Sequence, residues 1–185
     1  MTVPIVLTTM KEIRTILNKE GPSVVGLERI ADMMRLLLPH SEEILGDHLR
    51  ESVRPERGLN PIYVESGGIT LTWGIVVPEE PTPVHSHGTW GVVAVIRGRD
   101  RYQRWRREDD GEGAGPAEVR LLEEQVLTVG DVMVLPPPPQ DIHLQQGHKG
   151  ETAYEFVLFG EDFLGRLPYL VFDPENGFAT EIYPR

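Results

Sequence analysis

From Pro61 onward, short runs rich in Val, Ile, Thr, Tyr and Trp alternate with Gly and Pro. Apolar runs of this length and composition, bounded by turn residues, predict β-strands. No helical pattern separates them, so the sequence predicts a β-sandwich or barrel. The predicted strands are IYVE, ITLTWGIVV, WGVVAVI, DRYQRW, EVRLLEEQVLTV, DVMVL, AYEFVLFG and YLVF.

The first third of the chain has a different, helical pattern. Apolar residues recur there at steps of three and four, which predicts amphipathic helices packed on one face. These residues are Ile13, Ile16, Leu17, Leu27, Ile30, Ala31, Met34, Leu37 and Leu38. Pro39 is expected to end the second helix, and Ser41 to cap a third that runs to about Leu49. We expect one domain over 1–185, with helices in 1–55 and a β-barrel in 60–185.

Composition narrows the possible partners and compartments. The 185 residues carry a net charge of −11, which argues against nucleic acid because no basic surface is available for phosphates. The absence of cysteine excludes disulfides and thiolate ligands, and is compatible with a reducing cytoplasm. No stretch approaches the roughly 20 apolar residues of a membrane helix, and the first residues do not resemble a signal peptide. We therefore expect a cytoplasmic protein without a membrane partner.

Two histidines one residue apart, His85 and His87, open a nearly apolar predicted strand. Alternate residues of a strand point to the same side, so the two imidazoles can bind one metal ion. His143, which follows the next strong turn and strand, is the natural third ligand. The alternative is that the pair is a surface feature of an exposed strand.

The stretch HSHGTWGVVAVIRG resembles the first signature of the cupin superfamily, in which His-x-His is followed by Glu and then Gly. Gly98 occupies the position of that final glycine, and Gly91 occupies the position of the glutamate. The resemblance implies a cupin double-stranded β-helix, which is a jelly-roll barrel, preceded here by an N-terminal helical segment.

A second stretch, GDVMVLPPPPQDIH, resembles the second cupin signature through Gly130, Pro136 and His143. It departs from that signature at Pro138, where a glycine is usual, and by two extra residues before the histidine. Together, the two stretches imply a metal site formed by His85, His87 and His143.

A three-histidine set behind N-terminal helices resembles cysteine dioxygenases and related bacterial thiol dioxygenases. That resemblance implies an Fe(II) enzyme that uses dioxygen to oxidise a small molecule, a thiol being converted to a sulfinate. Three neutral histidines leave Fe(II) with a charge near +2, which suits an anionic ligand such as a thiolate. Hydrolytic zinc sites use the same three ligands, so iron is implied by the resemblance and not by the spacing.

The chain departs from cysteine dioxygenases at a late strand that carries Ser-x-His-x-Tyr in that family. EFVLF occupies the matching stretch and places Glu155, Val157 and Phe159 at those positions. The Cys–Tyr crosslink is impossible without cysteine, and the usual substrate-binding arginine ahead of the histidine pair is absent. Strand alternation could aim Glu155 at the metal as a fourth ligand or a base; the alternative is that it faces water.

A replacement for the missing arginine can be sought on the following strand. If RGRD is a two-residue hairpin with Gly98 and Arg99 at its tip, Tyr102 and Arg104 face the same side as Gly91. Arg104 would then bind a substrate carboxylate and Tyr102 would donate a hydrogen bond. In the alternative, Arg104 belongs to a solvated row of arginines.

Two other functions stay open on the sequence alone. A zinc, nickel or manganese cupin could act as an isomerase, lyase or hydrolase, and a non-catalytic cupin could bind a small ligand. For the oxygenase, the expected partners are a small-molecule substrate and dioxygen, with the chain as a monomer or homodimer.

Overall fold

The computed structural model describes residues 3–49, 59–161 and 169–182. In these ranges helical segments come first and strands follow, in the order that the sequence predicts. The helical segments are α1 (Pro4–Glu20), α2 (Val24–Arg35), η1 (Leu38–His40), α3 (Ser41–Leu45) and η2 (Gly46–Leu49). The strands are β1 (Leu59–Val64), β2 (Thr70–Val76), β3 (Val84–Ser86), β4 (Gly91–Arg97), β5 (Arg99–Arg107), β6 (Gly115–Pro116), β7 (Val119–Thr128), β8 (Val132–Leu135), β9 (His143–Gly147), β10 (Ala153–Phe159), β11 (Tyr169–Asp173) and β12 (Phe178–Ile182).

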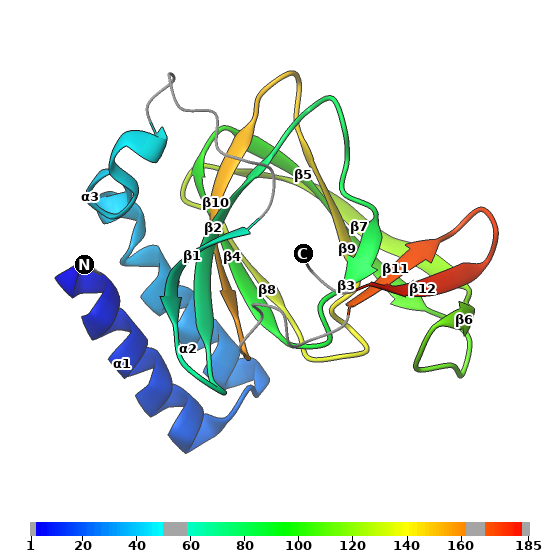
Figure 1. The fold of residues 1–185 in the computed structure, drawn as a ribbon, viewed down its shortest axis with the longest axis horizontal. Helices are drawn as coiled ribbons and strands as arrows, with labels where there is room; N and C mark the ends of the chain where they lie inside the picture. Colours follow the sequence, from blue (N-terminus) through cyan, green and yellow to red (C-terminus); the bar gives the residue numbers. More distant parts are fainter. Residues whose placement is uncertain (1–2, 50–58, 162–168, 183–185) are drawn as a thin grey trace.

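The strands form two antiparallel sheets that face each other across a common interior (Figure 1). One sheet has the order β1-β2-β10-β4-β8, and the other has the order β6-β12-β11-β3-β9-β5-β7. Strands distant in the sequence are therefore neighbours, as in β3 beside β9 and β10 beside β4. The arrangement confirms the predicted double-stranded β-helix with an N-terminal helical segment.

The helices cover the outer face of the five-stranded sheet (Figure 1). Strand alternation produces this division: Val92 and Ala94 of β4 pack in the cluster that includes the helices, whereas Val93 and Val95 pack inside the barrel. The sheet is thus apolar on both faces. This explains why β4 reads as a continuous apolar run instead of an alternating one.

Two predicted helix boundaries are wrong. The second helix ends at Arg35, and Pro39 lies within the short η1 segment. That segment leads directly into α3, so Ser41 already has helical backbone angles (φ −56°, ψ −39°) and does not cap the helix. A serine cap does occur earlier, where the Gly26 N–H donates to the Ser23 hydroxyl at 3.1 Å. Residues 50–55 of the predicted helical segment lie outside the described residues, and the domain limits stay a prediction.

The predicted hairpin from Gly98 to Arg99 is also wrong. β4 pairs with β10 and β8, whereas β5 pairs with β7 and β9 in the other sheet. Gly98 has φ +76°, and a Cβ there would lie 2.1 Å from the Thr152 carbonyl oxygen. The glycine therefore carries the chain from one sheet to the other, close against a neighbouring backbone. No described helix is long and apolar enough to cross a membrane.

The packing of α2 on the sheet yields a stability prediction. Ile30 is fully buried in that helix, whereas Val25 on the same helix is 60% exposed. Replacing Ile30 by Ala removes buried methyl groups and leaves a cavity, so we expect a loss of about 2–5 kcal/mol in the free energy of unfolding. Val25→Ala should change it by less than about 0.5 kcal/mol. Urea unfolding followed by circular dichroism measures both; equal effects would contradict the packing described here.

Candidate metal centre

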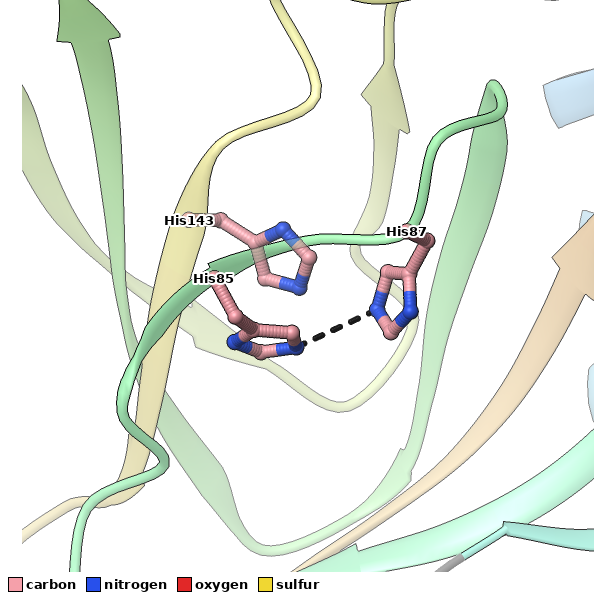
Figure 2. A group of neighbouring side chains, drawn as sticks. All are labelled: His85, His87 and His143. Carbon is pink, nitrogen blue, oxygen red and sulfur yellow. Dashed lines mark hydrogen bonds between the residues drawn. The ribbon is translucent and has the colours of Figure 1, made fainter. Parts of the chain in front are cut away.

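The three predicted histidines come together at one end of the barrel interior. β3 and β9 are antiparallel neighbours, and His85 lies directly opposite His143 in their register. His87 follows β3 at the next same-side position. Figure 2 shows the three imidazoles pointing toward one another, and their candidate ligand nitrogens all lie within 4.8 Å of one another.

The spacing of these nitrogens suits a single metal ion. The Nε2 atoms of His85 and His87 are 3.2 Å apart. Two nitrogens that each lie about 2.1 Å from one ion are separated by roughly 3.0–3.4 Å at octahedral to tetrahedral angles. The ring centroid of His143 lies 4.3 Å from that of His85 and 5.1 Å from that of His87. The three side chains therefore fit a common ion.

Backbone carbonyls fix the tautomers of two of the rings. The Nδ1 of His85 lies 2.9 Å from the Pro83 carbonyl oxygen, and the Nδ1 of His143 lies 2.9 Å from the Asp141 carbonyl oxygen. A carbonyl oxygen only accepts, so each Nδ1 carries the proton and each Nε2 presents its lone pair. These bonds orient the rings as outer partners do in metal sites.

Burial keeps the three imidazoles neutral, which is the form that binds metal. It lowers the pKa of His85, and it lowers the pKa values of His87 and His143 well below the usual value. Mutual repulsion between the rings adds to the effect at His87 and His143. The alternative in which His85 and His87 are surface residues of an exposed strand is wrong, because both side chains are buried.

Asp141 positions the turn that follows β3, and sequence reasoning missed it. One of its carboxylate oxygens accepts from the backbone N–H of His87 at 3.0 Å and from that of Gly88 at 2.8 Å. Gly88 has φ +72°, which suits the sharp turn. Burial raises the pKa of Asp141 to about 6, although the backbone hydrogen bonds oppose this shift. The only signal in the sequence was the position of Asp141 two residues before His143.

The histidines line a cavity of about 260 Å³. Its apolar wall includes Val93, Leu135, Val157 and Phe159, and its polar wall includes Gln145 and Glu155. A larger groove of about 630 Å³ is lined by Ser86, Arg107 and the loop around Gly111, but by none of the histidines. The smaller cavity is therefore the one that belongs to the metal centre.

Gly91, at the position of the cupin glutamate, lies beside this centre. A Cβ built there would be 3.8 Å from the ring of Phe159, which itself packs against His87 with 4.8 Å between ring centroids. The chain thus provides no carboxylate from that position. Among the described residues, the cluster of candidate ligands consists of His85, His87 and His143.

Glu155 faces the barrel interior and is 1% exposed, so the alternative in which it faces water is wrong. The amide of Gln145 donates to Glu155 at 2.8 Å and to Asp100 at 2.9 Å, which joins the two carboxyl groups. Burial, with the negative charge of Asp100 as a second cause, raises the pKa of Glu155 well above its usual value. Burial also raises the pKa of Asp100 to about 6. Burial thus favours the protonated form of both carboxyl groups.

The two remaining predicted residues have different surroundings. The ring of Tyr102 is buried and stacks on His143, with 5.6 Å between centroids and an interplanar angle of 3°. Arg104 lies opposite His143 in the register, and its guanidinium donates to the carboxylate of Glu123 at 3.1 Å. Arg104 is not among the described residues that line the cavity. Its carboxylate-binding role and the hydrogen bond from Tyr102 stay predictions.

Tyr169 is a neighbour of the centre that sequence reasoning missed. It begins β11, which pairs with β3, and its ring centroid lies 5.9 Å from those of both His85 and His87. Burial raises the pKa of its phenol. The predicted strand YLVF contains this tyrosine, but nothing in its local sequence indicates that β11 lies next to β3.

No protein-family model matches the chain. Among solved structures, it is similar to an RmlC-like cupin family protein from Methanocaldococcus jannaschii that has a double-stranded β-helix fold. The identity is 11% and the TM-score 0.44, over 62% of this chain and 87% of that one.

A protein from Klebsiella pneumoniae with a double-stranded β-helix domain has 16% identity and a TM-score of 0.45, over 65% of this chain and 85% of that one. Recombinant oxalate oxidase in complex with glycolate has 20% identity and a TM-score of 0.40, over 51% of this chain and 43% of that one. At this level of similarity, none of these proteins assigns a reaction to this chain.

The raised pKa of Glu155 predicts how stability depends on pH. A carboxyl group that is more basic in the folded protein stabilises it below the unfolded pKa of about 4, and this contribution is lost as the pH rises toward the folded pKa. Because glutamine does not titrate, the stability of Glu155→Gln does not fall with this contribution as the pH rises. We therefore expect the variant to gain stability relative to the wild type as the pH increases from about 5 to about 8.

Thermal unfolding of both proteins at the two pH values measures this difference. Glu151→Gln is the control, because Glu151 is an exposed carboxylate whose contact is with Arg99 at the surface. A difference between Glu155→Gln and wild type that does not change with pH would show that Glu155 does not hold a proton on folding.

Proposed function

We propose that this protein is a mononuclear non-haem Fe(II) dioxygenase that oxidises a small substrate, by resemblance a thiol converted to a sulfinate. The observation that supports the proposal best is the convergence of His85, His87 and His143, three buried and neutral imidazoles, on a small cavity. When bound, Fe(II) would supply Lewis acidity and the one-electron chemistry needed to activate dioxygen. The histidines would hold it through nitrogen alone.

The absence of a carboxylate ligand has an electrostatic consequence. Three neutral imidazoles leave the full double positive charge at the centre, whereas a glutamate at the position of Gly91 would cancel part of it. Such a centre favours an anionic substrate atom, of which a thiolate is one example. The apolar side chains of Val93, Leu135, Val157 and Phe159 exclude water from this end of the cavity and strengthen that attraction.

Glu155 is the group that can exchange a proton with a bound substrate. It lines the same cavity as the histidines, and the Gln145 amide joins it to Asp100 by donating to both carboxyl groups. A substrate that enters as a thiol must lose a proton to become a thiolate. The carboxyl pair can accept that proton without exposing the cavity to water.

The same carboxyl pair favours a second candidate function. A buried group that takes up and returns protons beside a metal site is also what an isomerase or lyase requires. In this alternative, zinc, nickel or manganese would replace iron and dioxygen would not be used. The identity of the metal in the purified protein, together with oxygen uptake, distinguishes the two functions.

We expect protein purified without added metal to contain close to one iron per chain and to consume oxygen when small thiols are supplied. In His143→Ala, the loss of one of three ligands should weaken metal binding by at least about 100-fold and abolish oxygen uptake. Metal analysis by mass spectrometry and an oxygen electrode measure the two quantities.

His40→Ala is the matched control, since His40 is exposed and contacts Glu43 on the helical side of the molecule. It should keep both the metal and the activity. Stoichiometric zinc or nickel without oxygen uptake would contradict the oxygenase and favour the non-oxidative enzyme. Purified protein without any metal would favour the third alternative, a non-catalytic cupin that binds a small ligand.

A further inference from the structure

A second cavity lies on the outer face of the seven-stranded sheet, behind the strand that carries the first two histidines. Ser86 lies between His85 and His87 in the sequence, so its side chain points to the opposite face of the sheet. Leu170, opposite Ser86 in the register, and Phe172, two residues further along β11, share this outer face. Ser86, Leu170 and Phe172 line a groove of about 630 Å³, which has no described lining residue in common with the metal cavity.

The loop that follows β5 forms one side of this groove, and a single arginine holds the loop in place. The side chain of Arg107 is 6% exposed and donates to the Asp109 carboxylate at 2.8 Å, to the Gly113 carbonyl at 2.9 Å and to the Pro116 carbonyl at 3.1 Å. Its guanidinium also lies over the ring of Phe172, 5.9 Å from the centroid. These contacts anchor the loop against the sheet, so the groove has a fixed wall.

The floor of the groove is apolar. Ile142 and Phe172 are buried, at 3% and 4% exposed, and Leu170 packs beside them while remaining partly exposed. Pro138 and Pro139 also line the groove and add apolar surface. Such a floor favours a ligand with an apolar body, because both apolar surfaces lose their contact with water on binding.

Three carboxylates without a partner line the same groove. Asp110 and Glu112 belong to the loop after β5, and Glu181 lies opposite Leu170 in the pairing of β12 with β11. All three residues are exposed. In the part of the chain that the structure describes, the side chain of none of the three makes a hydrogen bond or an ion pair.

The other charged groups of the groove already have partners. Asp109 is paired with Arg107, and Asp141 accepts from the backbone N–H groups of His87 and Gly88. Arg107 is the one cation among the described residues that line the groove. The groove therefore combines an apolar floor with uncompensated negative charge, which a ligand with a cationic group complements.

We propose that this groove binds a small organic cation, a molecule with an apolar body and an ammonium or guanidinium group. The body contacts Ile142, Leu170 and Phe172, and the cationic N–H groups donate to the three unpaired carboxylates. The volume of about 630 Å³ lies within the roughly 300–1,000 Å³ of small-molecule pockets. The proposal does not depend on the metal or on the dioxygenase function, because different residues line the two cavities.

Calorimetric titration of the purified protein tests this proposal with three ligands that share one apolar body: phenylbutylamine, phenylbutanol and phenylbutyrate. At neutral pH they end in an ammonium, a hydroxyl and a carboxylate. We expect the amine to bind at least about fivefold more tightly than the acid at low salt, because each exposed carboxylate contributes a small attraction or repulsion. This amine-to-acid affinity ratio should fall at about 0.5 M salt, where exposed charges are screened.

Variants separate the contribution of charge from that of the floor. The double variant Glu112→Gln/Glu181→Gln should lower the amine-to-acid affinity ratio at least about threefold and leave the affinity for the alcohol unchanged. Leu170→Ala removes part of the floor and should weaken all three ligands by a similar factor, about three- to tenfold. Glu175→Gln should change neither quantity, because Glu175 is exposed between β11 and β12 and does not line the groove. Thermal unfolding confirms that each variant is folded.

Equal affinities for the amine and the acid, failure of all three ligands to bind, or an unchanged ratio in the double variant would each overturn the proposal. Glu155→Gln checks the location, since Glu155 lines the metal cavity. We expect unchanged amine binding in this variant, and a loss would put the ligand in the metal cavity instead. If no ligand binds, sedimentation velocity tests whether a second copy of the chain covers the groove, as a dimer that dissociates in Leu170→Ala would show.

Discussion

The contact between β3 and β9 brings the candidate metal ligands together, and the proposed chemistry depends on it. β3 has only three residues, yet it pairs with β11 on one side and places His85 opposite His143 on the other. A shift of one residue in this register would turn one imidazole to the opposite face of the sheet. The two carbonyl contacts at Nδ1 and the Asp141 contact with the following turn hold the rings in the geometry that the pairing creates.

The cavity wall combines the three histidines with Glu155, which the Gln145 amide joins to Asp100. The histidines are buried and neutral, whereas Asp100 and Glu155 are buried carboxyl groups whose pKa values are raised by burial. Burial of two neighbouring carboxyl groups costs free energy unless they are hydrogen-bonded, and the Gln145 amide donates to both.

The sequence predicts the fold class and the three histidines that converge in the barrel, because each prediction rests on a local pattern. Strand alternation puts His85 and His87 on one side, and the two cupin-like stretches indicate His143. The helical steps of Ile30 and Met34 likewise predict the helices, although not their ends. These signals need no knowledge of which strands are neighbours.

The polar wall could not be predicted in this way, since it depends on long-range pairing. Asp100, Gln145 and Glu155 come from three strands in two sheets, and their contact follows from the crossing of the chain at Gly98. RGRD resembles a hairpin in sequence, because a two-residue turn and a crossing between sheets both use glycine. The proposed carboxylate-binding role of Arg104 was argued from that hairpin, and it stays a prediction without that support. Tyr169 was missed for the same reason, as only the pairing of β11 with β3 brings it to the histidines.

The central claim is that His85, His87 and His143 bind one metal ion without a protein carboxylate. Anomalous X-ray diffraction from crystals of the purified protein, recorded at the absorption edge of the metal it contains, tests this claim most directly. The account predicts one anomalous peak about 2.1 Å from the Nε2 atoms of all three histidines. A peak elsewhere, a peak coordinated by Glu155, or no peak in crystals of protein supplied with iron would contradict it.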